Sequence, residues 1–191
     1  MTTFFIKNTA MKPALLIVDV QNDYFRGGKM ELVEMEAACE NVKNLLSWFR
    51  ANNFPVVFIQ HLAIRPNATF FIPETVGAEI HKSILPTESE TVITKHFPNS
   101  FRETSLHDYL QAQNPTELVI CGAMSHMCID TTTRAAFDLG YTCSVIADAC
   151  ATRDLIYNDQ KIKATNVQLA YMAALNGTFA KVICTKQFLT H

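Results

Sequence analysis

The chain has 191 residues, of which 49% are hydrophobic and 18% are charged. This length suits one domain with its own hydrophobic core, and the composition excludes a disordered or low-complexity chain. Because 16 basic residues nearly balance 18 acidic ones, and no basic or acidic run stands out, we expect neither nucleic acid nor a membrane surface as a partner.

The N-terminal residues lack the long apolar segment and the cleavage site of a secretory signal. Apolar runs such as ALLIV are too short to span a membrane. The 6 cysteines are scattered through apolar stretches without a CxxC pair, a pattern typical of reduced thiols. We therefore expect a cytoplasmic protein with an N-terminal leader over residues 1–12 and a single domain over residues 13–191.

The predicted elements alternate between short apolar strands and amphipathic helices. Residues 14–20 form a continuous apolar run, which is typical of a strand buried on both faces. Apolar residues then recur every three to four positions from Leu32 to Phe49, which predicts a helix. A second strand is predicted over 55–60. The stretch 61–90 carries several prolines and predicts an irregular excursion with room for one short helix.

The second half of the chain continues this alternation. Strands are predicted over 91–95, 117–122, 141–149 and 179–185, and helices over 104–113, 128–140 and 159–177. Thr104 or Ser105 is the candidate N-cap of the first of these helices, with Asp108 in capping-box position to Ser105. Gly140 and Gly177 are placed to end the other two. The alternation implies an α/β fold, in which helices cover both faces of a mainly parallel sheet in a three-layer α/β/α arrangement.

In doubly wound parallel sheets, ligands bind beyond the carboxyl ends of the strands, where the strand order reverses. Asp19, Lys95 and Cys128 lie at or just beyond the predicted carboxyl ends of the first, third and fourth strands. We therefore expect these three side chains to share one site. Cys128 also begins a predicted helix, where unpaired N–H groups favour a thiolate.

Three motifs surround these residues: IVDVQND with Asp19, VITKHFPNSF with Lys95, and ICGAMSHMCIDTTTRAAFDLGY with Cys128. Together with the GAEIH and VIADA stretches, they resemble the isochorismatase-like cysteine hydrolases, which include nicotinamidases, N-carbamoylsarcosine amidases, ureidoacrylate amidohydrolases and streptothricin hydrolases. The resemblance runs from about residue 13 to the C-terminus. It implies a six-stranded, Rossmann-like parallel sheet, an Asp–Lys–Cys triad, and assembly into a dimer or tetramer.

The resemblance, together with the chemistry of the triad, implies a hydrolase that cleaves a C–N bond of a small amide, carbamoyl or lactam-like substrate through a thioester. Cys128 would attack the carbonyl, Asp19 would take the thiol proton and pass it to the departing nitrogen, and Lys95 would balance the charge. The resemblance implies an oxyanion hole made by the backbone N–H groups of Met124 and Cys128. It also implies a cis peptide bond between Ala123 and Met124.

Candidate substrate contacts around this site are Phe25, His61, Phe97 and Ser125. A metal ion is not expected, because the Asp-x-His pair that binds a divalent ion in nicotinamidases after the second strand is missing here, and His81 lies twenty positions beyond His61. No other cofactor is expected. Whether His61 or His81 contributes to any metal or substrate site stays open.

Two alternative functions stay open on the same fold. A vinyl-ether hydrolase of the isochorismatase type would not require a cysteine nucleophile, so the presence of Cys128 favours C–N hydrolysis. A redox-sensing or binding protein would use Cys128 as a sensor and would need no acid aimed at a leaving group. No resolving cysteine lies within a few residues of it. The physiological substrate, the oligomeric state and the role of the 61–90 stretch also stay open.

Overall fold

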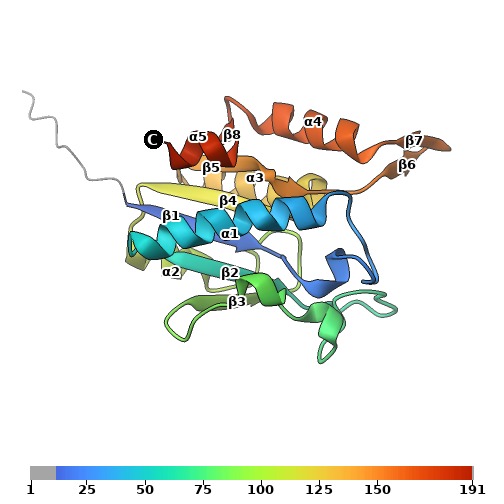
Figure 1. Ribbon diagram of the computed structural model, residues 1–191, viewed down its shortest axis with the longest axis horizontal. Coiled ribbons are helices and arrows are strands. Elements are labelled where there is room, and N and C mark those ends of the chain that lie inside the picture. Colours follow the sequence, from blue (N-terminus) through green and yellow to red (C-terminus); the bar gives the residue numbers. More distant parts are fainter. Residues whose placement is uncertain (1–11, 191) are drawn as a thin grey trace, which may run out of the picture.

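The apolar runs form the central sheet of the molecule (Figure 1). In the computed structural model, which describes residues 12–190, a 6-stranded sheet has the order β3-β2-β1-β4-β5-β8, and all its neighbouring strands are parallel. The strands are β1 (Pro13–Val18), β2 (Val56–His61), β3 (Thr91–Lys95), β4 (Glu117–Ala123), β5 (Cys143–Ala151) and β8 (Lys181–Ile183). The strand order reverses between the adjacent strands β1 and β4. The predicted α/β class with a six-stranded parallel sheet is confirmed.

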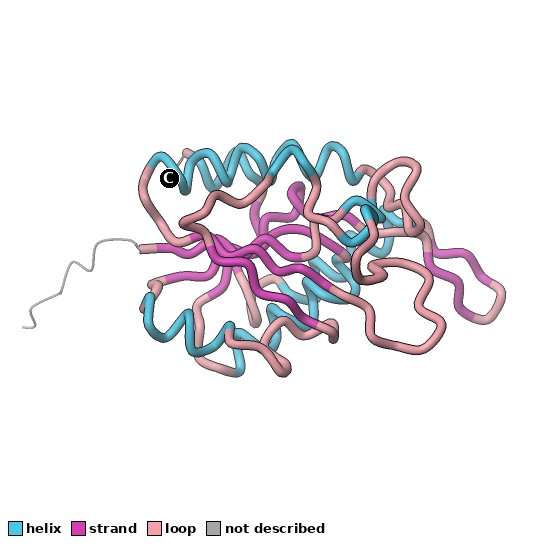
Figure 2. The backbone as a smooth tube through the Cα atoms, turned by 90° about the horizontal axis from the view of Figure 1, so that it is seen from below, coloured by secondary structure: helices cyan, strands magenta, loops and turns pink. Residues whose placement is uncertain are grey.

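Helices cover both faces of this sheet (Figure 2). They are α1 (Met35–Ala51) and α5 (Thr185–Leu189) on one face, and α2 (Leu106–Gln113), α3 (Asp130–Asp138) and α4 (Ala164–Leu175) on the other. Successive residues of β1 therefore pack into opposite layers: Leu15 and Ile17 share a core with α1, whereas Leu16 and Val18 share one with α2 and α3. Because both faces of the strand are buried, its sequence is apolar without interruption.

The segment before α4 differs from the predicted helix over 159–177. Residues Leu155–Tyr157 (β6) and Gln160–Ile162 (β7) form an antiparallel hairpin, which extends away from the body of the molecule (Figure 1). Its two connecting residues, Asn158 and Asp159, have φ of 49° and 57°. Positive φ at both positions suits the tight turns that join two strands. The Asn-Asp pair was the local signal for this hairpin.

The N-terminus of α2 also differs from the prediction. Ser105 is its N-cap residue, but the Ser105 side chain makes no capping hydrogen bond, so the predicted capping box with Asp108 does not form. Thr104 takes over part of this role, because its Oγ1 accepts a hydrogen bond from the N–H of Leu106 at 3.3 Å. The predicted end of the next helix agrees better: α3 stops at Asp138, and Gly140 follows with φ of 88°.

The irregular stretch between β2 and β3 contains two short 3-10 turns, η2 (Val76–Ala78) and η3 (Lys82–Ile84), where one short helix was expected. A third, η1 (Asn22–Tyr24), follows β1. Of the predicted leader, residues 1–11 lie outside the described residues, and Lys12 already bonds to Thr116 Oγ1 at 2.9 Å. Within the described residues, no helix combines the length and hydrophobicity that crossing a bilayer requires.

Candidate active site

The three residues expected to share one site meet beyond the carboxyl edge of the sheet. Asp19 follows β1, Lys95 ends β3, and Cys128 lies in a π-helical turn, η4 (Ser125–Ile129), between β4 and α3. Lys95 Nζ lies 2.7 Å from Asp19 Oδ2 and 3.3 Å from Cys128 Sγ. Asp19 and Lys95 are fully buried, and Cys128 is 5% exposed. The fold thus brings a carboxylate, an ammonium and a thiol into direct contact.

His61 completes the surroundings of the Lys95 ammonium group. Strand β2 lies between β3 and β1, and its last residue, His61, is the register partner of Lys95. Lys95 Nζ contacts His61 Nδ1 at 2.9 Å and the carbonyl oxygen of Phe97 at 3.1 Å. An ammonium group can only donate, so His61 accepts at Nδ1 and carries its proton on Nε2. Burial and then the charge of Lys95 lower the pKa of His61 from 6.5 to about 4, which keeps the ring neutral.

The resting charges follow from burial and pairing. Burial alone would lower the pKa of Lys95, but the nearby Asp19 and Cys128 outweigh it, and the pKa of Lys95 is raised. Burial and then the Asp19 carboxylate raise the pKa of the Cys128 thiol, and the positive charge of Lys95 opposes them only in part. The site at rest therefore holds an ion pair beside a neutral thiol. The expected thiolate must form when Cys128 passes its proton to a base.

Asp19 is placed to be that base. Ligand atoms of Asp19, His61 and Cys128 all lie within 4.8 Å of one another. Apart from the ion pair with Lys95, the buried Asp19 carboxylate accepts no hydrogen bond from the described residues. A buried acceptor without a donor is costly, and a proton arriving from the thiol would satisfy it.

The same three ligand atoms raise the question of a metal ion. Carboxylate, imidazole and thiolate are all metal ligands. However, Lys95 Nζ lies 2.7 Å from Asp19, 2.9 Å from His61 and 3.3 Å from Cys128. The ammonium thus already satisfies the atoms that a metal ion would need and would repel a second cation. These residues do not fit a metal site.

The turn from β4 to η4 contains the two backbone N–H groups, of Met124 and Cys128, that were expected to form an oxyanion hole. Gly122 pairs with Val18 of β1 and has φ of 117°, and the Ala123–Met124 peptide bond that follows it is cis. The Met124 N–H donates no hydrogen bond to another described residue. The Cys128 N–H lies in the first turn of a helical segment, where N–H groups lack an intrahelical acceptor. Both groups are therefore available to a negative oxygen.

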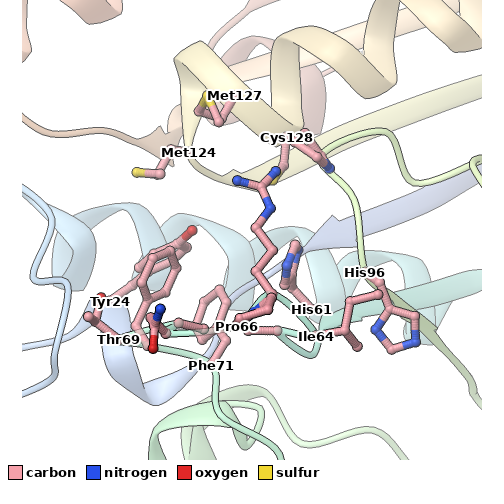
Figure 3. A pocket seen from close by; sticks show the side chains of 16 residues that line it. Tyr24, His61, Ile64, Pro66, Thr69, Phe71, His96, Met124, Met127 and Cys128 are labelled. Atoms are coloured by element: carbon pink, nitrogen blue, oxygen red, sulfur yellow. The ribbon is translucent and has the colours of Figure 1, made fainter.

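A cavity of about 300 Å³ opens beside Cys128. Figure 3 shows Met124, Met127 and Cys128 on one side of it, facing Tyr24, His61, Ile64, Pro66, Thr69, Phe71 and His96 on the other. Most of the opposite wall belongs to residues 63–71, the first part of the irregular stretch after β2. The volume lies at the lower end of the range of about 300–1,000 Å³ typical of small-molecule sites, so the cavity suits a small ligand.

His61 lines this cavity, but the other three predicted substrate contacts do not. Phe25 stacks on the His81 ring, with 3.8 Å between ring centroids. The Phe97 ring lies 3.5 Å from the Arg102 guanidinium carbon. The hydroxyl group of Ser125 is buried and bonds to residues of β5 and α4. Proximity in sequence to the triad does not fix the direction of a side chain, so these three residues lie outside the cavity, and a contact with the substrate stays a prediction for them.

Sequence reasoning missed the loop residues that form the opposite wall, including Arg65, Phe70 and Phe71. Their local signal is the adjacent aromatic pair in a stretch that otherwise has no regular structure. Tyr24, which also lines the cavity, lies close to the nucleophile: burial, and then Cys128 and Asp19, raise its pKa well above the ordinary value. Tyr24 thus stays a neutral phenol.

Two buried polar side chains after β1 hold this wall in place. Gln21 clamps the end of β2: its Oε1 accepts a hydrogen bond from the His61 N–H at 2.7 Å, and its Nε2 donates to the His61 carbonyl at 2.9 Å. Asp23 Oδ2 accepts a hydrogen bond from the Phe71 N–H at 2.7 Å. Gly77 leaves room for this contact, because a Cβ there would lie 2.2 Å from Asp23 Oδ1. The wall is therefore fixed by side chains far from it in sequence.

A cysteine beside a buried lysine–aspartate pair, at the strand reversal of a Rossmann-like sheet, defines the class of isochorismatase-like hydrolases. The chain belongs to the isochorismatase family, since the pattern of the isochorismatase domain matches residues 13–187. Members of this family are hydrolases.

Three similar proteins illustrate this relationship. The isochorismatase family protein YddQ of Bacillus subtilis is 51% identical over 179 residues, which cover 94% of this chain and 99% of YddQ. A streptothricin hydrolase of Streptomyces noursei is 34% identical over 142 residues, covering 74% of this chain and 50% of that protein. A solved structure from Oleispira antarctica, assigned to the isochorismatase hydrolases, superposes with a TM-score of 0.91 at 44% identity and covers 100% of both chains.

Proposed function

We propose that the protein is a cysteine-dependent hydrolase that cleaves a C–N bond of a small amide, carbamoyl or lactam-like substrate through a thioester intermediate. The observation that carries this proposal is the buried Asp19 carboxylate, which is paired only with Lys95 and lies within 4.8 Å of the Cys128 sulfur. A base in this position can take the thiol proton and return it to a leaving nitrogen. The similarity to a streptothricin hydrolase supports hydrolysis of this kind.

The reaction begins when the carbonyl carbon of the substrate reaches Cys128 Sγ in the cavity. The sulfur attacks as its proton moves to Asp19, and the oxygen of the tetrahedral intermediate takes up negative charge. The N–H groups of Met124 and Cys128 stabilise that charge. Throughout this step, Lys95 keeps the negative charge on Asp19 and sulfur balanced.

The intermediate then collapses, and the bond from carbon to nitrogen breaks. Asp19 donates its proton to the nitrogen, so that ammonia or an amine leaves and a thioester remains on Cys128. A water molecule gives a proton to Asp19 as its oxygen attacks the thioester carbon. The bond from carbon to sulfur then breaks, the carboxylic acid leaves, and Asp19 returns its proton to the sulfur, which restores the neutral thiol.

We propose further that the protein acts on a small molecule as a homo-oligomer in the cytoplasm, with neither nucleic acid nor a membrane as a partner. All six cysteines are free in the structure, which supports a reducing compartment. The cavity beside Cys128 is too small for a macromolecule to enter and supports a small substrate.

The test compares Cys128→Ala with Cys39→Ala, which removes a buried thiol on α1. Ammonia release from a panel of small amides should fall by at least about 10³-fold in Cys128→Ala, because the nucleophile is lost. Cys39→Ala should stay close to the wild type. Mass spectrometry of the quenched wild-type reaction should show an acyl group on the peptide that contains Cys128.

Turnover that survives in Cys128→Ala would contradict the thioester route. Hydrolysis of a vinyl ether by that same variant would favour the isochorismatase-type reaction. A wild type that releases no ammonia from any amide, but whose Cys128 is oxidised reversibly by peroxide, would favour the redox sensor.

A further inference from the structure

The cavity beside Cys128 contains a cation without a counter-ion. Arg65 lines it, and none of the side chains that line it is acidic. None of the ion pairs within the described residues includes Arg65. Arg65 is an exposed residue; Arg50, Arg102 and Arg134 each pair with a carboxylate, whereas Arg26 and Arg153, which also have no ion pair among the described residues, do not line this cavity. An unpaired guanidinium in the wall of a small cavity is therefore open to a ligand.

The remaining charges of the site do not offset Arg65. The carboxylate of Asp19 is already paired with Lys95. His61 is neutral, and the positive charge of Arg65 is the smallest of the causes, after burial, Lys95 and His96, that lower the pKa of His61. The charge of Arg65 thus acts on the interior of the site. With the Cys128 thiol protonated, the cavity carries a net positive charge before substrate binds.

The loop that carries Arg65 is closed at its base. The N–H of Ala63 donates a hydrogen bond to the carbonyl of Phe71 at 2.8 Å, and Asp23 accepts one from the Phe71 N–H at 2.7 Å. Within the loop, the Ala68 N–H donates to the Arg65 carbonyl at 3.2 Å. These bonds fix both ends of the segment, so the backbone of Arg65 is held over the cavity.

We infer that the substrate carries a carboxylate, which pairs with the Arg65 guanidinium while the scissile amide lies at Cys128. This inference rests on the proposed hydrolase and names its substrate class: small amides of dicarboxylic acids and similar anionic amides. The planar guanidinium fork matches a carboxylate with two parallel hydrogen bonds. The apolar walls formed by Phe71 and Met124 suit a short hydrocarbon spacer between the two ends of the substrate.

The first test measures the anion site without requiring hydrolysis. Iodoacetate and iodoacetamide have nearly the same shape, and both alkylate a cysteine sulfur with loss of iodide, but only iodoacetate is anionic. The rate constants for Cys128 with each reagent are followed by mass spectrometry. Their ratio, iodoacetate over iodoacetamide, should fall about tenfold in Arg65→Met, since a charge-assisted hydrogen bond is lost. Arg65→Lys should retain part of the preference.

Arg26→Met is the matched control for this experiment. Arg26 is an exposed arginine that does not line this cavity, so its removal changes the net charge equally but should leave the ratio as in the wild type. An equal ratio in the wild type and Arg65→Met would overturn the anion site.

The second test uses succinamate and its neutral methyl ester as paired substrates, with ammonia release as the readout. In the wild type, the KM of succinamate should be at least about tenfold lower than that of the ester. Arg65→Met should abolish this preference, and Arg26→Met should keep it. Equal KM values for both compounds in the wild type and in Arg65→Met would contradict the inference and leave the hydrolase standing.

The two tests also separate the inference from the proposed function. If the wild type releases no ammonia from these compounds or from any other amide of the panel, but Arg65→Met still lowers the alkylation ratio, the anion site stands and the amide hydrolase fails. The wild type could instead release ammonia from the methyl ester as well as from succinamate. If Arg65→Met then changes neither the alkylation ratio nor the KM preference, only the substrate class is wrong.

Discussion

At the scale of single residues, Lys95 links the stability of the site to its chemistry. Its ammonium group contacts Asp19, His61, the Phe97 carbonyl and Cys128, and its side chain is fully buried. A buried cation is tolerated only where such partners replace water. Removing Lys95 would leave the Asp19 carboxylate buried without a partner. Loss of activity in a Lys95 variant must therefore be separated from loss of folding.

His61 allows a cleaner test at this scale, because folding lowers the pKa of its ring from 6.5 to about 4. Its folded pKa is lower than its unfolded value, so the folded protein binds fewer protons at this residue within that window. The free energy of unfolding should therefore fall as the pH falls from 6.5 to 4. Above pH 6.5 the ring is neutral in both states, so His61 should not make the unfolding free energy depend on pH. His61→Gln keeps an acceptor for Lys95 and removes the titration.

Urea unfolding across this pH range would measure the effect. The slope of the unfolding free energy against pH should be smaller in His61→Gln than in the wild type. Equal slopes in both proteins would mean that the imidazole is not held neutral by its surroundings.

At the scale of elements, the contact between β1 and β4 places the nucleophile turn against the base. Gly122 lies opposite Val18, the residue before Asp19, and a Cβ on Gly122 would lie 2.0 Å from the Val18 carbonyl oxygen. Only glycine therefore lets the two strands approach this closely and adopt φ of 117°. The separation between Asp19 and Cys128 depends on this approach.

Gly122→Ala should consequently destabilise the fold by more than Gly140→Ala. Gly140 also has positive φ, at 88°, but a Cβ there would meet no atom within 4 Å, so its replacement costs only the backbone strain of about 1–2 kcal/mol. Gly122→Ala should cost a similar backbone strain and, in addition, the steric overlap of the new Cβ with the Val18 carbonyl oxygen. Urea denaturation of both variants measures the difference, and equal losses of stability would contradict the proposed close approach.

At the scale of the whole molecule, the β6–β7 hairpin presents apolar side chains to solvent. Ile156 and Tyr157 are 77% and 73% exposed, on a hairpin that extends beyond the layers (Figure 2). An isolated two-stranded hairpin is only marginally stable in water. Exposed apolar side chains on such an element favour a contact with a second copy of the chain.

We therefore expect the wild type to be a dimer or tetramer and the double variant Ile156→Lys/Tyr157→Lys to shift toward the monomer. Light scattering after size-exclusion chromatography would report the change toward the chain mass of 21.4 kDa. Val76→Lys is the control, because Val76 is 71% exposed on a different element and should not alter the mass. A monomeric wild type would refute the expected assembly.

The sequence alone determined the layered fold and placed Asp19, Lys95 and Cys128 at or just beyond the carboxyl ends of β1, β3 and β4. Apolar periodicity depends only on neighbours along the chain, so the sequence is enough to predict the strands. Because ligands bind beyond the carboxyl ends of parallel strands, the predicted strands also indicate where Asp19, Lys95 and Cys128 lie. The same local reasoning could not find the hairpin turn, because a helical pattern over 159–177 competed with the short Asn-Asp signal.

Only the tertiary structure decided the neutral state of the thiol, the tautomer of His61 and the cavity wall that carries Arg65. Each of these depends on burial or on contacts between segments far apart in sequence. Lys95 contacts His61 on the adjacent strand, and Asp23 accepts a hydrogen bond from Phe71 in the loop after β2. Such contacts depend on strand order and on which groups lose water, and no pattern of neighbouring residues encodes either.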